Sequence, residues 1–299
     1  MNSATHHALS TSPDQGTFPL NQWMSSAPGM DLLSLGELIL PGAHNCGVDL
    51  AASYAFAPVR HWTACQNQSF YYQLINGARA LDIRLEYNIN ARVDTYRFHH
   101  SGIRSSRTLD NLVTDVARFL HENPDEFIIL DFHELQSGNT PFDYQEFQTT
   151  LITQLGRRII PFVNVDLSLN ELKRISPLQR IMLAAEWHPN LNDYYFCRKI
   201  EHKWSGVGLT STDRLHAHIT EVMKYPPRSV MPWSLSATSY TIAGGPVDIK
   251  EYLNKWFNPL NSDWILKSSI VNADFFEESK LVEYCRAANL IKSASTKHS

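Results

Sequence analysis

The chain has 299 residues, of which 43% are hydrophobic, 11% aromatic and 19% charged, and its formal net charge at pH 7 is −4. The aromatic content excludes an intrinsically disordered chain, and the acidic balance argues against nucleic-acid binding, which needs a basic surface. A chain of this length can bury a core without disulfide or metal cross-links.

The first 20 residues are polar, and we expect a disordered or loosely ordered segment there, followed by one domain over residues 21–299. They lack the basic start and apolar stretch of a signal peptide. We therefore expect a cytoplasmic chain, or one secreted by a signal-independent route, unless a signal was trimmed. No run of 18 apolar residues is long enough to cross a bilayer. We expect a monomer.

Four cysteines are scattered along the chain: Cys46, Cys65, Cys197 and Cys285. Their spacing fits neither a disulfide framework nor a zinc site, so we expect four free, apolar side chains.

Strand-like apolar segments alternate with helical patterns from residue 32 onward. We expect strands over residues 37–41, 78–87, 95–100, 126–135, 180–187, 230–237 and 264–272. We expect helices over residues 108–121, 144–155 and 277–290. Strand followed by helix, repeated along the chain, predicts an α/β fold with a mainly parallel sheet and right-handed crossovers. The pattern alone fits both a closed barrel and an open sheet.

Polar side chains lie at or just beyond the ends of the first four strands: His44, Asn45, Asp82, Arg84, His99, His100, His133 and Glu134. Ligands bind at this edge of parallel α/β folds. Asp82 and Arg84 leave the same face of their strand, either as a structural ion pair or as site residues. His99 and His100 point to opposite faces, so only one of them can share a cleft with Asp82.

Two histidines, an arginine and acids suit phosphoryl transfer. The reaction needs a base for the attacking hydroxyl, an acid for the leaving oxygen and a fixed cation for the charge on phosphorus-bound oxygens. Histidine can do both proton transfers, because its pKa is near neutral.

Three segments resemble the motifs of the phosphatidylinositol-specific phospholipase C X domain, in the family's order: residues 40–47 (LPGAHNCG), 76–84 (NGARALDIR) and 98–102 (FHHSG). Residues 119–132 resemble the helix and fourth strand of the single-domain bacterial enzymes and their X-domain-containing relatives. Residues 60–62 and Gln66 are similar to a Trp and a Gln of the family. The resemblance implies a single-domain, distorted (β/α)8 TIM-type barrel. It also implies cleavage of phosphatidylinositol, at a membrane surface, to diacylglycerol and inositol 1,2-cyclic phosphate.

The resemblance further implies a role for individual residues. His44 would be the general base on the inositol 2-hydroxyl, and His100 the general acid for the diacylglycerol oxygen. Arg84 would hold the phosphate, and Asp82 would orient His100 or Arg84. Asp274 would orient His44, although it could instead cap the helix expected from residue 277.

The candidates for substrate binding are Asn45, His133 and Glu186. Calcium-dependent members of the family have an Asn at the position of Asn45, but an acid at the position of Arg84 and a Glu where this chain has His133. A guanidinium would occupy the place of the cation, and Asn45 with Asp82 offers too few oxygens for calcium. We therefore expect no metal or cofactor, with calcium at Asn45 and Asp82 as the alternative.

The implied substrate lies in a bilayer, so we expect apolar contacts with the membrane from Trp62 and Tyr240. Two other functions remain open at this point. One is a non-catalytic barrel that binds inositol phospholipids. The other is a phosphodiesterase for a different inositol-containing substrate, such as a glycosylated lipid anchor or a soluble cyclic inositol phosphate.

Overall fold

The computed structural model describes residues 17–89, 95–243 and 245–296. Its centre is a sheet with eight parallel strands in the order β7-β6-β5-β2-β1-β12-β9-β8. The eight strands are β1 (Leu40–Ala43), β2 (Ala80–Tyr87), β5 (Ile128–Ser137), β6 (Ile181–Ala185), β7 (Phe196–Arg198), β8 (Glu201–Lys203), β9 (Trp233–Ala237) and β12 (Ile270–Ala273).

The two outermost strands of this order, β7 and β8, are neighbours in the chain. Only Lys199 and Ile200 separate them, a link that spans roughly 10 Å at full extension. The sheet must therefore curl until its two edges nearly meet, and the result is a distorted barrel rather than a flat, open sheet.

Two further pairings extend this barrel. β3 (Tyr96–His100) pairs antiparallel with β2, and β4 (Ile103–Thr108) pairs antiparallel with β3. β10 (Ser239–Thr241) and β11 (Gly245–Val247) form a separate antiparallel hairpin. The prediction of a mainly parallel sheet is confirmed, with an antiparallel extension from β2 that the pattern did not indicate.

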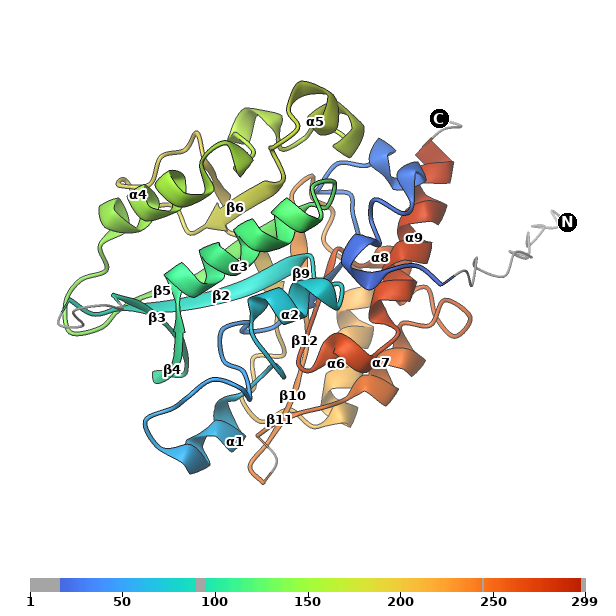
Figure 1. Ribbon diagram of the computed structural model, residues 1–299. Helices are drawn as coiled ribbons and strands as arrows, with labels where there is room; N and C mark the ends of the chain where they lie inside the picture. Colours follow the sequence, from blue (N-terminus) through green and yellow to red (C-terminus); the bar gives the residue numbers. More distant parts are fainter. Residues whose placement is uncertain (1–16, 90–94, 244, 297–299) are drawn as a thin grey trace, which may run out of the picture.

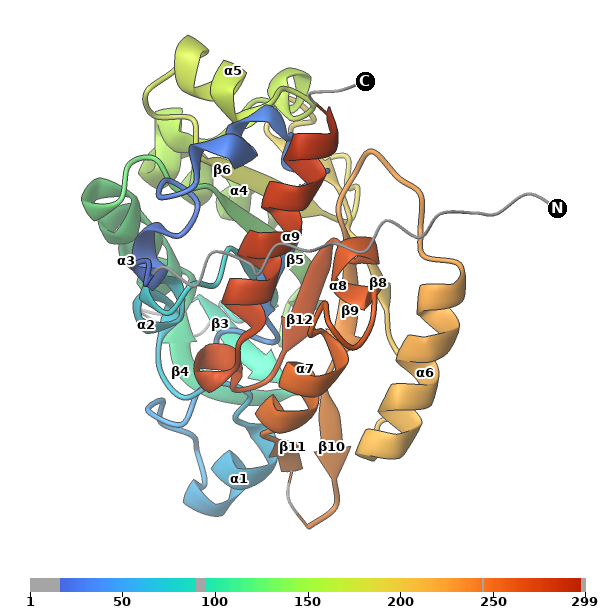
Figure 2. The same ribbon diagram turned by 90° about the vertical axis from the view of Figure 1, so that its right-hand side faces the viewer.

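Helices surround the sheet in Figure 1, and Figure 2 shows α7 and α9 in the foreground near β12, with α6 beside β8 and β9. The helices are α1 (Arg60–Thr63), α2 (Phe70–Ile75), α3 (Leu109–Glu122), α4 (Tyr144–Leu155), α5 (Leu169–Ile175), α6 (Thr212–Lys224), α7 (Lys250–Trp256), α8 (Trp264–Lys267) and α9 (Leu281–Thr296). Short 3-10 helices cover Leu20–Gln22, Pro28–Leu32, Ala57–Val59, Gly156–Arg158, Phe162–Asn164 and Phe276–Glu278. Within the described ranges, no helix combines the length and apolar character that a bilayer crossing requires.

The sequence explains the best-defined elements. α3 begins at a capping box between Thr108 and Asn111, and ends before Pro124. Its apolar residues, spaced three and four apart, form one buried stripe. The first five residues of β5 are all buried, as expected for a strand covered on both faces.

Two expectations near the C-terminus need correction. The segment 264–272 is not one strand: α8 occupies Trp264–Lys267, and β12 begins only at Ile270. The α8 start is supported by Ser262, whose hydroxyl accepts a hydrogen bond from the Trp264 amide. The helix expected from residue 277 begins at Leu281, because the left-handed backbone of Phe275 (φ 45°) and a 3-10 turn precede it.

Most of the N-terminal segment expected to be loosely ordered, residues 1–16, lies outside the described residues. In its last four residues, 17–20, Phe18 and Leu20 pack on the hydrophobic core. The ring of Phe18 also lies 4.6 Å below the Arg286 guanidinium.

Candidate active site

The C-terminal end of β1 presents His44 and Asn45. The register Ala43↔Ala273 between β1 and β12 makes His44 and Asp274 neighbours, because each directly follows one of these paired residues. The Gln66 amide fixes the same point, since its Nε2 donates to the carbonyls of His44 (2.8 Å) and Ala273 (3.0 Å). Gly47 closes the turn where a Cβ would lie 1.9 Å from the Phe98 ring.

The His44 imidazole is held from both sides. Its Nδ1 lies 2.7 Å from Asp274 Oδ1, and its Nε2 lies 3.0 Å from Arg84 Nη2. A guanidinium can only donate, so Nε2 accepts and the ring proton is on Nδ1, which donates to Asp274. The Nε2 lone pair therefore points toward Arg84 and into the cluster.

Asp82 binds Arg84 through both oxygens, with Oδ2 3.0 Å from Nη2 and Oδ1 3.3 Å from Nε. Its Oδ2 also accepts from the Asn45 amide (3.2 Å) and from Asn272 Nδ2 (3.1 Å). Burial alone would raise the pKa of Asp82, but the positive charge of Arg84, with smaller contributions from His133 and His44, holds it well below its usual range. Burial would lower the pKa of Arg84, but Asp82 raises it. The pair is therefore charged at neutral pH, and Asp82 orients Arg84.

His100, near the end of β3, approaches the cluster from the other side of Cys65. Its Nδ1 lies 3.0 Å from the Thr63 carbonyl, to which it donates, and 3.9 Å from the Cys65 sulfur. The same sulfur lies within 4.8 Å of a His44 ring nitrogen. Burial, followed by the charges of His44 and Arg84, lowers the pKa of His100 to about 4. The two histidines thus share one side of the barrel mouth, and His100 is neutral at neutral pH.

A second cluster lies at the ends of β5 and β8. The ring of His133 stacks on that of His202, with centroids 3.7 Å apart and planes 19° from parallel. His202 Nε2 lies 2.6 Å from Asp131 Oδ2, and Asp131 is the register partner of Asp82 on β2. Burial first, and then His202, lower the pKa of His133 to about 3, although Asp82 opposes the shift.

The other two residues predicted to bind substrate lie differently. Asn45 has a left-handed backbone (φ 44°) and a buried side chain whose amide has no hydrogen-bond partner in the described part of the chain. Glu186 is not brought into the cluster. Its carboxylate is 72% exposed and pairs with Lys199 at 3.3 Å, because it follows the last residue of β6 on the solvent side.

Trp62 and Tyr240 belong to one rim of the barrel. Trp62 Nε1 donates to the Ile242 carbonyl (2.8 Å), and the Tyr240 hydroxyl donates to the Trp62 carbonyl (3.0 Å). These bonds join α1 to the β10–β11 hairpin, which lie together at the lower end of the molecule in Figures 1 and 2. Trp62 is 44% exposed, and Ile242, whose carbonyl it binds, is 74% exposed. Tyr240 is half-buried, with its ring edge-on to His100.

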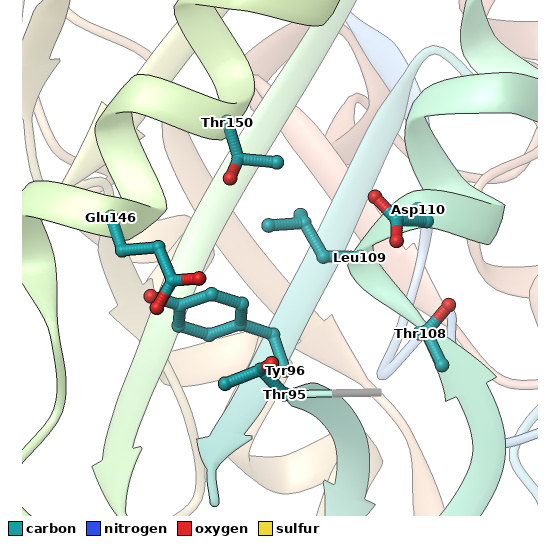
Figure 3. A pocket seen from close by; sticks show the side chains of 7 residues that line it. All are labelled: Thr95, Tyr96, Thr108, Leu109, Asp110, Glu146 and Thr150. Atoms are coloured by element: carbon teal, nitrogen blue, oxygen red, sulfur yellow. The ribbon is translucent and has the colours of Figure 1, made fainter. Parts of the chain in front are cut away.

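Figure 3 shows a small pocket elsewhere, between α4 and the start of α3. Its lining includes two carboxylates, Asp110 and Glu146, and no base or cation. The start of α3 is already capped by Thr108 and Asn111, so this pocket offers no reactive group.

No protein-family model matches the chain. Over 133 residues it is 29% identical to a 1-phosphatidylinositol phosphodiesterase from Listeria monocytogenes, an alignment that covers 44% of this chain and 39% of that protein. Over 128 residues it is 36% identical to a variant-surface-glycoprotein phospholipase C from Trypanosoma cruzi, covering 42% of this chain and 32% of that protein. The aligned part thus spans less than half the length of either curated relative.

The fold is more widely shared than the sequence. The phosphatidylinositol-specific phospholipase C from Listeria monocytogenes superposes with a TM-score of 0.69 at 20% identity, covering 91% of this chain and 99% of that one. The resemblance to the phosphatidylinositol-specific phospholipase C X-domain family is confirmed. A Staphylococcus aureus enzyme of the same name has a TM-score of 0.66 at 14% identity, covering 90% and 98%. The expected distorted TIM-type barrel is likewise confirmed.

Several residues of the cluster could not be predicted from the sequence. Asn272 and Cys65 lie in apolar or irregular segments that give no signal of their own. Asp131 lies inside an apolar strand run, and His202 lies in a strand of only three residues, too short to show a period. Their signal is the pairing of strands, which no local pattern contains.

Proposed function

We propose that this chain is a phosphatidylinositol-specific phospholipase C that needs no metal for the reaction. The inositol 2-hydroxyl attacks the phosphorus, and the products are diacylglycerol and inositol 1,2-cyclic phosphate. The observation that carries the proposal is the environment of His44. Its ring is aligned by Asp274 at 2.7 Å, and its Nε2 faces the guanidinium of Arg84 at 3.0 Å.

His44 is the general base. Its Nε2 takes the proton of the 2-hydroxyl as the new oxygen–phosphorus bond forms, and Asp274 stabilises the imidazolium that results. Arg84 turns from His44 to a phosphate oxygen, which frees the Nε2 lone pair and neutralises charge that develops on the phosphate. Asp82 stays bound to the guanidinium while Arg84 changes its partner from His44 to the phosphate oxygen.

His100 is the general acid. Its Nδ1–H is held by the Thr63 carbonyl, so a proton gained at Nε2 is available to the diacylglycerol oxygen as the phosphorus–oxygen bond breaks. The pKa of about 4 applies to the free protein, in which His44 and Arg84 act against protonation. A bound phosphodiester adds a negative charge to the same space, and this raises the pKa of His100 toward neutrality.

Arg84 takes the place that calcium would need. Asp82 already accepts from Arg84, from the Asn45 amide and from Asn272, so its oxygens are engaged. Calcium requires six to eight oxygen ligands, and a guanidinium 3.0 Å from Asp82 repels it. Calcium at Asn45 and Asp82 is therefore disfavoured on charge and on donor number.

The substrate is reached at a membrane surface. Trp62 and Ile242, joined by a hydrogen bond, form an exposed apolar rim suited to insertion among lipids. Tyr240, which binds the Trp62 carbonyl and lies edge-on to His100, connects this rim to the site. One related Staphylococcus aureus structure concerns modulation of that enzyme's membrane binding. A glycoprotein-linked inositol phospholipid is the second candidate substrate, because the Trypanosoma cruzi relative is a variant-surface-glycoprotein phospholipase C.

The test uses vesicles that contain either phosphatidylinositol or phosphatidylcholine as the only cleavable lipid, with and without a calcium chelator. We expect release of water-soluble inositol phosphate from the phosphatidylinositol vesicles and no release of phosphorus compounds from the phosphatidylcholine vesicles. The chelator should leave the rate unchanged. Absence of release from both lipids contradicts the activity. If the chelator abolishes the release and added calcium restores it, the proposed role of Arg84 is contradicted.

A further inference from the structure

We propose that Tyr240 is a positioning residue for the general acid, because it fixes the backbone of α1 that orients the His100 ring. The inference rests on the proposed function, in which His100 protonates the diacylglycerol oxygen. Tyr240 contacts both partners. Its hydroxyl donates to the Trp62 carbonyl at 3.0 Å, and its ring centroid lies 6.1 Å from that of His100, with the two planes 87° apart. One side chain therefore joins the acid to the segment that holds it.

The orientation of His100 depends on one backbone carbonyl. Its Nδ1 donates to the carbonyl of Thr63 at 3.0 Å, and this bond keeps one proton on Nδ1 and leaves Nε2 for exchange with the substrate. Thr63 is the last residue of α1, so the ring is placed only as well as this helix is. A shift of the carbonyl turns Nε2 away from the oxygen that it has to protonate, and a misplacement of about 1 Å can cost about 10²-fold in rate.

The helix α1 cannot hold this position alone. It has only four residues, Arg60–Thr63, and no side chain in the described ranges caps its first turn. Isolated helices shorter than about 12 residues are marginal in water even when their sequence favours a helix. The placement of the Thr63 carbonyl must therefore come from contacts between α1 and other parts of the chain.

Contacts of this kind come from the β10–β11 hairpin, next to which α1 lies in Figures 1 and 2. Trp62 Nε1 donates to the Ile242 carbonyl (2.8 Å), and His61 Nε2 donates to the Ala243 carbonyl (2.7 Å). At Gly245, whose φ is +62°, an added Cβ would lie 2.2 Å from the His61 carbonyl oxygen and 2.9 Å from Trp62 Cα. The backbone of the hairpin therefore packs directly against that of α1.

The hydrogen bond from Tyr240 acts next to the acid. Its acceptor, the Trp62 carbonyl, belongs to the peptide group that links Trp62 to Thr63, and the following carbonyl is the one that binds His100. The bond ends on the backbone, so it does not depend on the Trp62 indole. The Tyr240 hydroxyl is thus assigned to alignment of the acid, whereas the Trp62 indole is assigned to the membrane surface.

The test compares two soluble, monomeric inositol phosphodiesters that differ in the leaving group. An alkoxide is a strong base and leaves only with help from the acid, whereas nitrophenolate is a weak base and leaves without protonation. Tyr240→Phe keeps the ring but removes the hydroxyl. We expect it to lower kcat on the alkyl substrate by about 2- to 10-fold, the contribution of one hydrogen bond. Its kcat on the nitrophenyl substrate and its affinity for phosphatidylinositol vesicles should equal those of the wild type.

The matched control is Tyr284→Phe on α9, because the Tyr284 hydroxyl also donates to a backbone carbonyl, that of Asn254, at 3.2 Å. It should have wild-type kcat on both substrates. Gly245→Ala, which pushes the hairpin away from α1, should repeat the selective loss of Tyr240→Phe.

Unchanged kcat of either folded variant on the alkyl substrate overturns the inference, as does an equal loss on both substrates. A loss by Tyr240→Phe that is confined to vesicles assigns the residue to membrane contact and overturns it too. Inactivity of the wild type on both substrates contradicts the proposed function itself, and the inference falls with it.

Discussion

His44 Nδ1 and Asp274 Oδ1 lie 2.7 Å apart, although 230 residues separate them in the chain. The contact follows from the pairing of β1 with β12 and is secured by the Gln66 amide, which binds the carbonyl before Asp274 and that of His44. The relative placement of His44 and Asp274 is thus fixed by the sheet itself, and little side-chain freedom has to be lost when a ligand binds.

Replacing Asp274 tests this contact. Asp274→Asn keeps the shape but can donate to Nδ1, which favours the ring tautomer with its proton on Nε2 and removes the base. We expect kcat on phosphatidylinositol vesicles to fall by about 10⁴-fold, with little change in melting temperature. Asp263→Asn, which alters an exposed carboxylate paired with Lys267, is the control. Wild-type turnover in Asp274→Asn contradicts the orienting role.

The two histidines should each be needed for turnover. We expect His44→Ala and His100→Ala to lower kcat by about 10²- to 10⁴-fold, the usual contribution of one general base or acid. His121→Ala, at an exposed position of α3, should have wild-type activity. Thermal unfolding of all three variants shows whether any loss is structural. A folded His44→Ala or His100→Ala variant with normal kcat loses its assigned role.

The pH dependence should differ between the free and the substrate-bound protein. His100 must be protonated to act as the acid, and its pKa of about 4 in the free protein means that the protonated fraction falls as pH rises above 4. Bound phosphodiester raises this pKa. The alkaline limb of kcat should therefore lie at higher pH than the alkaline limb of kcat/KM. The measurement is the pH profile of kcat and that of kcat/KM, recorded under the same conditions. Coincident alkaline limbs contradict the acid role of His100.

The rim residue Trp62 should matter for vesicles and not for chemistry. Trp62→Ala removes a 44% exposed indole, and we expect vesicle affinity to fall by about 10-fold, the equivalent of about 1.4 kcal/mol. Turnover of a soluble, monomeric phosphatidylinositol analogue should be nearly unchanged. Tyr225→Ala is the control, because Tyr225 directly follows the last residue of α6 and precedes β9, away from the rim. Equal vesicle binding by wild type and Trp62→Ala contradicts the proposed membrane face.

The sequence predicted well where one local pattern was sufficient. The helix expected over 144–155 has those bounds, and the apolar run of β5 is a buried central strand. The prediction of a strand for the segment before β12 was wrong, because an apolar stretch around Trp264 fits both a short helix and a strand. Local hydrogen bonds at Ser262 decide that choice, and a hydropathy pattern does not contain them.

The site residues divide in the same way into those that a local pattern predicts and those that it does not. Motif residues such as His44 and Arg84 could be chosen from their positions at strand ends. Asp131 and His202 could not, since they become neighbours only through the curl that brings β8 back toward β5. Glu186 had the right chemistry and position in the sequence, but its side chain leaves the end of β6 toward solvent.

Phosphorus NMR of the reaction with phosphatidylinositol distinguishes intramolecular attack by the 2-hydroxyl from hydrolysis by water. We expect inositol 1,2-cyclic phosphate to be the first water-soluble phosphorus-containing product, formed at least about 100-fold more slowly by His44→Ala. Acyclic inositol phosphate or phosphatidic acid, formed with no cyclic intermediate, would contradict this expectation.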